Sequence, residues 1–342
     1  VCVCAVVADL SPPDIPYPEN YPQQFPFQDI LKAWNPDDIT VPDTYPQYNS
    51  LKYFDYQTEL AEALMYRSLE LPFIIRNIPN LHEVGELWTD EYLTEQSKTI
   101  SIRTETAASN HFMYHNGHTR SGKLPTQSVR MNYAEWSRRA NDKEKKLDNG
   151  EPLFYMRMSG YPASGDFIGK DLSMYSPPSF FVKQPENQRG IHCRFGMPSI
   201  IAESHYDGGR NFIAMIRGSK RYVLNAPDQC SKLSMLKSGM SARHASFDWS
   251  DPANFAKFGD ATGLEVVLTA GDVLYVPAFW FHYIVSLEKN VQCNTRSGTP
   301  AVDADAIKDC GFGVRVNDPA VTSRSMDTGK REWMRSAPSV KD

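Results

Sequence analysis

The second half of the chain constrains the fold most. From Glu151 onward, short runs rich in aromatic and β-branched residues alternate with Gly, Pro and Asp. Evenly spaced strands with tight turns and no helices between them are typical of an antiparallel sandwich or barrel. We therefore expect a mainly β fold with flanking helices. The runs that we predict as strands are Phe154–Met158, Gly190–Gly196, Asn211–Arg217, Arg221–Asn225, Glu265–Thr269, Val273–Val276, Tyr283–Leu287 and Val291–Thr295.

Helical signals lie ahead of this half. They are apolar residues repeated on one helix face and N-cap residues that precede acidic first turns. Because helices and strands interleave, we expect one decorated domain over residues 51–300 rather than two domains. We predict helices over Tyr56–Leu69, Thr89–Gln96 and Asn132–Lys146, and strands over Pro72–Arg76, Thr99–Arg103 and His111–His115.

Both ends of the chain differ from this domain. Residues 1–50 are rich in Pro and Tyr, which predicts an extended arm without regular helix that lies over the domain or binds a partner. Its first residues, Val1–Ala8, are small and apolar, as in the end of a secretory signal peptide or in an ordinary strand. Residues 301–342 are polar and predict a tail that wraps or frays.

Charge and cysteine content limit the partners. Thirty-six Lys and Arg against 41 Asp and Glu give a net charge of −5, and no run approaches the ~18 apolar residues of a membrane span. We expect a soluble globular protein with no nucleic-acid partner and no membrane span. The compartment stays open between the secretory-pathway lumen and the cell interior. The six cysteines include no Cys-x-x-Cys pair, and we interpret Cys193 and Cys293 as buried thiols.

Two histidines and one aspartate form the pattern with most chemical content. His205 and Asp207 lie in SHYDGG, and His282 lies in FWFHYI. Residues i and i+2 of a strand point the same way, so His205 and Asp207 can bind one ion that His282 completes from a neighbouring strand. Two imidazoles and a carboxylate on one face of an octahedral ion suit Fe(II), Mn(II) or Co(II), as in non-haem Fe(II) oxygenases.

The same residue types have simpler interpretations. A single His-x-Asp is common by chance in a chain with eight histidines, and His282 among aromatic residues is equally typical of a packed core histidine. A second group of histidines, His111, His115 and His118, surrounds an Asn-Gly pair and suits a hairpin better than a metal site.

Longer stretches resemble a known family. From about residue 55 to 296 the chain resembles the Jumonji-C/cupin-like Fe(II)- and 2-oxoglutarate-dependent oxygenases, and within them the asparaginyl hydroxylase of hypoxia-inducible factor. The matching stretches are SHYDGGRNFIAMIRGSKRYVLNAPDQ, FDWSDPANFAKFGD, TAGDVLYVPAFWFHYIVSL and, before them, MNYAEWSRRA and EPLFYMRM. The resemblance implies a double-stranded β-helix (jelly-roll or cupin) core in which His205, Asp207 and His282 are the catalytic iron ligands.

The resemblance also implies a cosubstrate site. Lys220 would bind the distal carboxylate of 2-oxoglutarate, since a buried dicarboxylate needs a fixed cation. Tyr155 would bind the same carboxylate, and Asn211 and Asn294 would lie beside the cosubstrate. Without the resemblance, Lys220 is a solvated hairpin residue and Tyr155 a core aromatic. The implied cofactors are Fe(II), 2-oxoglutarate and dioxygen.

The chain departs from the family pattern at three places. Ala202 stands where the asparaginyl hydroxylase has a cosubstrate-binding Thr, and Arg194 stands where it has an apolar inward residue. The Arg194 guanidinium either clamps the distal carboxylate with two hydrogen bonds or faces solvent. No counterpart of that enzyme's dimer helices follows Ala301.

The sequence thus predicts a dioxygenase that hydroxylates a side chain of a protein or peptide substrate. One alternative is a demethylase or an oxygenase of a small molecule or tRNA base. The other is a cupin-like scaffold or assembly subunit without turnover, for which the N-terminal arm would bind the partner. Loss of 2-oxoglutarate turnover on replacing His205 would separate the enzymes from the scaffold.

Overall fold

The computed structural model describes residues 18–107, 109–113, 126–239 and 241–319. Its strands are β1 (Phe25–Pro26), β2 (Tyr53–Asp55), β3 (Phe73–Arg76), β4 (Ile102–Ala107), β5 (His111–Phe112), β6 (Thr126–Met131), β7 (Phe154–Gly160), β8 (Gln188–Gly196), β9 (Ile201–Tyr206), β10 (Asn211–Arg217), β11 (Ser219–Asn225), β12 (Thr262–Thr269), β13 (Val273–Val276), β14 (Phe281–Ser286) and β15 (Asn290–Ser297). Its helices are α1 (Phe27–Ala33), α2 (Leu60–Ser68), α3 (Pro79–Leu87), α4 (Asp90–Ser97), α5 (Tyr133–Lys145), α6 (Phe167–Asp171) and α7 (Ala304–Asp309).

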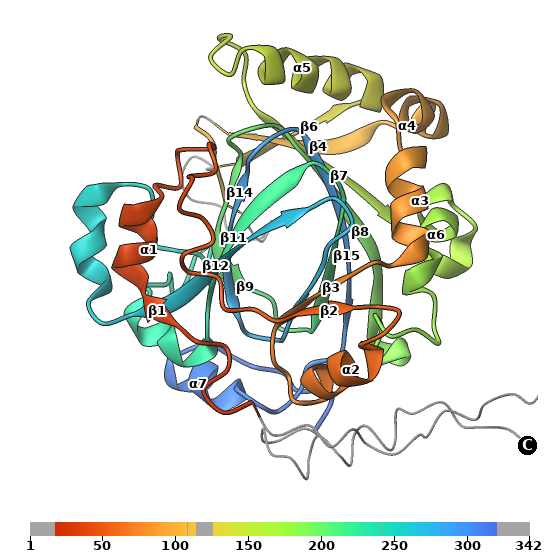
Figure 1. The fold of residues 1–342 in the computed structure, drawn as a ribbon. Helices are drawn as coiled ribbons and strands as arrows, with labels where there is room; N and C mark the ends of the chain where they lie inside the picture. The colour runs from red at the N-terminus through yellow and green to blue at the C-terminus, as the bar shows by residue number, and fades with distance from the viewer. Residues whose placement is uncertain (1–17, 108, 114–125, 240, 320–342) are drawn as a thin grey trace, which may run out of the picture.

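The strands form two sheets that enclose the centre of the molecule (Figure 1). One has the order β1-β12-β11-β14-β9-β5, and the other has the order β2-β3-β13-β10-β15-β8-β7-β4-β6. Strands β8 to β15 alternate between the sheets except at β11 and β12, which pair with each other in the six-stranded sheet, and this is the pairing of a double-stranded β-helix. The predicted mainly β jelly-roll fold with flanking helices is confirmed.

The predicted helices form where their caps lie. The Thr89 side chain accepts a hydrogen bond from the backbone nitrogen of Tyr92 at 3.1 Å and begins α4. The Asn132 side chain accepts one from the nitrogen of Glu135 at 2.8 Å and begins α5. The other predicted helix is shorter than expected and becomes α2, whereas α3 and α6 were not expected.

The N-terminal arm corrects one prediction. An arm without regular helix is wrong for Phe27–Ala33, because these seven residues contain no proline and form α1. Phe27, Ile30 and Leu31 are buried against β12 and the 3₁₀ segment Pro252–Phe258. Together with the β1–β12 pairing, α1 covers the outer face of the six-stranded sheet (Figure 1). The predicted leader Val1–Ala8 lies outside the described residues.

The six-stranded sheet is therefore buried on both faces. Its inner face, with Tyr222 and Leu224 of β11, belongs to the larger apolar cluster between the sheets. Its outer face, with Val223, belongs to a second cluster formed with α1, α7 and the segment 226–261. Two charged neighbours on β11, Lys220 and Arg221, are thus both buried although they point to opposite faces.

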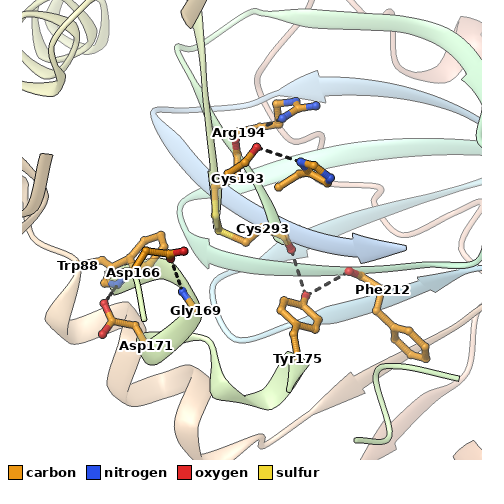
Figure 2. Close-up of a disulfide and its surroundings, with 11 residues drawn as sticks. Trp88, Asp166, Gly169, Asp171, Tyr175, Cys193, Arg194, Phe212 and Cys293 are labelled. Carbon is orange, nitrogen blue, oxygen red and sulfur yellow. Dashed lines mark hydrogen bonds between the residues drawn. A yellow bond between two sulfur atoms is a disulfide. The ribbon is translucent and has the colours of Figure 1, made fainter. Parts of the chain in front are cut away.

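Two disulfides join strands and loops that are far apart in sequence. Cys193 of β8 lies opposite Cys293 of β15, and the two are bonded (Figure 2). The interpretation of these two residues as thiols is wrong, because strand register brings together cysteines 100 residues apart. A second bond joins Cys230 to Cys310 and ties the end of α7 to the segment after β11.

The predicted C-terminal tail contains α7, and its residues 320–342 lie outside the described part. Within the described residues, every helix is too short or too polar to cross a membrane.

Candidate metal centre and cosubstrate cavity

The three predicted metal ligands meet at one end of the barrel. His205 lies near the end of β9, Asp207 follows that strand, and His282 of β14 pairs directly with His205. One ligand atom from each lies within 4.8 Å of the others, and the two imidazole centroids are 4.4 Å apart. The donor set of two nitrogens and one oxygen fits Fe(II) and leaves coordination positions open toward the cavity.

A β-bulge sets which residues of β9 face this centre. Between the pairs His282–His205 and Ile284–Ala202, β9 has one residue more than β14. Glu203 and Ser204 therefore lie opposite the single residue Tyr283. The bulge lets both Ala202 and His205 face inward although they are three residues apart. Ala202 supplies no hydroxyl, as the sequence indicated.

Backbone carbonyls orient both imidazoles. His205 Nδ1 donates to the carbonyl of Glu203 at 2.8 Å, and His282 Nδ1 donates to the carbonyl of Trp280 at 3.0 Å. In this tautomer each Nε2 carries the lone pair that can bind a metal. Burial lowers the pKa of both rings. The neighbouring His282 lowers the pKa of His205 further. Both imidazoles are therefore neutral at physiological pH, the form that binds a metal.

Asp207 is held as a carboxylate. Burial alone would raise its pKa, but the neighbouring charge of Arg296 outweighs this and lowers it. Arg296 Nη1 donates to Asp207 Oδ1 at 2.6 Å, and Asn211 Nδ2 donates to Oδ2 at 3.2 Å. Asn294 in turn donates to Asn211 at 2.7 Å. The two asparagines predicted to lie beside the cosubstrate thus form a hydrogen-bonded chain that positions Asp207.

These residues open into a cavity of about 210 Å³ between the two sheets. The predicted residues Tyr155, Arg194, Asn211 and Asn294 all line it, so the Arg194 guanidinium belongs to the cavity and not to the solvent face. The lining residues that the sequence did not predict include three arginines and a histidine, namely Arg157, Arg243, Arg296 and His244. His244 stacks on His205 with centroids 5.1 Å apart, but it comes from the loop after β11, for which sequence periodicity gives no direction.

Lys220 does not line this cavity itself but contacts Tyr155, which does. It is fully buried, and its Nζ donates to the Tyr155 hydroxyl at 3.0 Å. Burial, and after it the charge of Arg194, lowers the pKa of Lys220 well below its ordinary value. Within the described residues no carboxylate is paired with this ammonium. A buried cation in this state favours an anionic ligand, which offsets the cost of desolvation.

The strands under the cavity are cross-linked. Arg194 directly follows Cys193 of the Cys193–Cys293 disulfide (Figure 2). Asn294 directly follows Cys293 on the neighbouring strand. Next to it, the Tyr175 hydroxyl donates to the carbonyls of Cys293 and Phe212, both at 3.1 Å. The disulfide and Tyr175 thus hold β8, β10 and β15 together where these strands carry cavity residues.

Comparison with known protein families identifies the family to which this fold belongs. A family model described as a cupin-like domain matches residues 60–295. The chain belongs to this cupin-like family. The predicted Jumonji-C/cupin-like relationship is thereby confirmed.

Individual relatives differ in their named roles. tRNA wybutosine-synthesizing protein 5 of Mus musculus is 28% identical over 239 residues, which cover 65% of this chain and 70% of that protein. Jumonji C domain-containing protein 5 of Drosophila melanogaster is 31% identical over 142 residues, or 40% of this chain and 35% of that protein. Lysine-specific demethylase 8 of Xenopus tropicalis is 30% identical over 105 residues, or 30% of this chain and 24% of that protein.

Proposed function

We propose that this protein is an Fe(II)- and 2-oxoglutarate-dependent oxygenase. The observation that carries the proposal is Lys220, which is buried without a carboxylate partner among the described residues. Its Nζ contacts Tyr155, a residue that lines the same cavity as the three candidate metal ligands. A scaffold gains nothing from such a charge, because an uncompensated buried cation destabilises the fold. An enzyme that binds a dicarboxylate gains affinity from it.

Two groups of residues would have separate roles, one in metal binding and one in cosubstrate binding. His205, Asp207 and His282 would hold the metal, while Lys220 and Tyr155 would hold the distal carboxylate of 2-oxoglutarate. When bound, iron with 2-oxoglutarate and dioxygen supplies oxidative decarboxylation to succinate and carbon dioxide, coupled to hydroxylation of a C–H bond. The protein orients Asp207 through Arg296 and Asn211 and keeps both imidazoles neutral.

The test is 2-oxoglutarate binding and turnover. Wild-type protein with Fe(II) should release succinate, and with Mn(II) it should bind 2-oxoglutarate in calorimetry. His205→Ala should abolish turnover, whereas His82→Ala, which replaces an exposed histidine of α3, should not change it. Absence of metal-dependent 2-oxoglutarate binding in the wild type would refute the proposal.

For the substrate, the comparisons favour an RNA base. The relatives matched over 65% of this chain carry a tRNA-modification name. Arg157 and Arg243 line the cavity in addition to Arg194 and Arg296, as expected where an anionic group of a substrate enters. Adding unfractionated tRNA should raise succinate release, and nucleosides from that tRNA should gain the mass of one oxygen.

A protein side chain remains the second candidate, supported by two observations. The net charge of −5 opposes RNA binding, and two disulfides are typical of an oxidising compartment such as the secretory-pathway lumen. Peptide-dependent succinate release with a hydroxylated peptide product, and no effect of tRNA, would favour this candidate. Free thiols at Cys193 and Cys293 in the native protein would remove its compartment argument.

A further inference from the structure

A second group of ionisable residues lies behind the metal centre, on the outer face of β9. It contains His111 of β5, Glu203 of β9 and Asp248, and one ligand atom from each lies within 4.8 Å of the others. Asp37 of the N-terminal arm adds another carboxylate, 3.8 Å from His111 Nε2. Four segments that are distant in sequence thus bring three carboxylates to one imidazole.

The imidazole of His111 is oriented from both sides. Its Nδ1 is hydrogen-bonded to Glu203 Oε1, which directs Nε2 toward the two aspartates. Asp248 Oδ2 lies 3.6 Å from Nε2, while Ser250 binds the other oxygen of Asp248 through its backbone nitrogen at 2.7 Å. In many metal sites, one nitrogen of a histidine binds the metal while the other is hydrogen-bonded to a supporting carboxylate. His111 has this arrangement, with Glu203 on one side and two aspartates on the other.

The charge of this group is unbalanced. The imidazole of His111 lies beside three carboxylates, those of Glu203, Asp248 and Asp37. Glu203 is 4% exposed, and its second oxygen, Oε2, is buried without a hydrogen-bond partner. An anion in this setting is costly unless a cation compensates it.

We propose that His111, Asp37 and Asp248, supported by Glu203, form a second binding site for a divalent transition-metal ion such as Zn²⁺. Two ligand atoms on one tetrahedral zinc ion are about 3.3 Å apart for bonds of about 2.05 Å. His111 Nε2 lies 3.8 Å from Asp37 Oδ1 and 3.6 Å from Asp248 Oδ2. Small movements of the two aspartates, which are about half exposed, would shorten these distances to about 3.3 Å. The site ties the arm and the segment 226–261 to the strand that carries His205.

The experiment removes the first metal centre so that only the second is measured. In the variant His205→Ala/His282→Ala, dialysed protein should retain about one equivalent of Zn²⁺, measured by elemental analysis and calorimetry. Asp37→Asn/Asp248→Asn on that background should weaken Zn²⁺ binding at least ~10-fold. Asp43→Asn, an exposed carboxylate of the same arm, is the matched control and should leave binding unchanged.

Two further readouts decide the outcome independently of oxygenase activity. Saturating Zn²⁺ should raise the Tm of the His205→Ala/His282→Ala variant by roughly 3–6 °C, and this rise should disappear with Asp37→Asn/Asp248→Asn. Anomalous diffraction at the zinc edge should place the ion beside His111 Nε2. No Zn²⁺ binding, equal binding by the aspartate variants, or an ion located elsewhere would overturn the proposal and leave a salt-bridge cluster.

Discussion

Lys220 and Arg221 are neighbours on β11, and both are completely buried, but the two faces of the strand treat them differently. On the outer face, Arg221 is paired with Glu265 at 2.6 Å, donates to the carbonyl of Trp34 at 2.7 Å, and lies over the Trp34 ring. On the inner face, Lys220 donates to the Tyr155 phenol at 3.0 Å. The positive charge of Arg221 is thus neutralised within the protein by Glu265.

The difference separates a structural charge from a functional one. Arg221 fixes the arm to the barrel, and its partners are complete without a ligand. Lys220 costs stability in the ligand-free protein and recovers this cost when an anion binds. Adjacent buried cations can therefore be assigned opposite roles from their partners alone, and each of the following variants tests that assignment.

The largest effect is expected from Arg221→Met. This variant leaves Glu265 buried without its cation, so the free energy of unfolding should fall by about 3–5 kcal/mol in urea titrations. Arg221→Met/Glu265→Leu should recover most of that loss, because both charges are then removed. A loss below ~1 kcal/mol for the single variant would show that Arg221 is not structural.

Lys220→Met should have the reverse profile. Its stability should equal or exceed that of the wild type, while the Kd for 2-oxoglutarate in the presence of Mn(II) should rise about 30- to 1000-fold. Lys52→Met, at an exposed lysine, is the control and should change neither quantity. Unchanged 2-oxoglutarate affinity in Lys220→Met would mean that the cosubstrate carboxylate binds elsewhere.

Tyr155→Phe should have a smaller effect on the same equilibrium. It removes one hydroxyl that contacts Lys220 and would contact the cosubstrate, so calorimetry should show a Kd for 2-oxoglutarate about 3- to 10-fold higher. The stability should change little, since the ring remains in the core. A loss as large as that of Lys220→Met would indicate that Tyr155 positions the lysine rather than the cosubstrate.

The smallest effect is a pH dependence of ligand-free stability. Because the folded-state pKa of Lys220 lies below the unfolded value of 10.5, the unfolded chain binds more protons between these two values. Stability contributed by this group should therefore be fully present above 10.5 and decrease as pH falls toward the folded pKa. Cosubstrate binding should take up as much as one proton, measurable by calorimetry in two buffers, and Lys220→Met should abolish this uptake.

Strand periodicity predicted the barrel because every strand from β7 onward except β9 was recognised as a separate run between turn residues. It also predicted that His205, Asp207 and His282 lie close together, although Asp207 directly follows β9 and is not part of that strand. It could not predict the pairing of Cys193 with Cys293, which depends on register between strands 100 residues apart. Nor could it show that both Lys220 and Arg221 are buried, because alternation assigns faces and does not reveal that the arm covers the outer one.

The cavity arginines show the same limit. Arg157, Arg243 and Arg296 come from two strands and a loop, and a single arginine in such a run is more often a solvated residue. Arg296 becomes significant only when the fold brings it to Asp207. The sequence therefore identified the residues that have a motif and missed those defined only by their neighbours.

The extra residue in β9 has a consequence for how such a chain can change over evolution. Deleting Ser204 would keep His205 and Asp207 in the sequence and would still turn either the proposed metal ligand His205 or the apolar residues of the strand to the wrong side of the sheet. A single missing codon here would thus be more damaging than most substitutions nearby. Length, as much as residue identity, is the property of this strand that selection has to preserve.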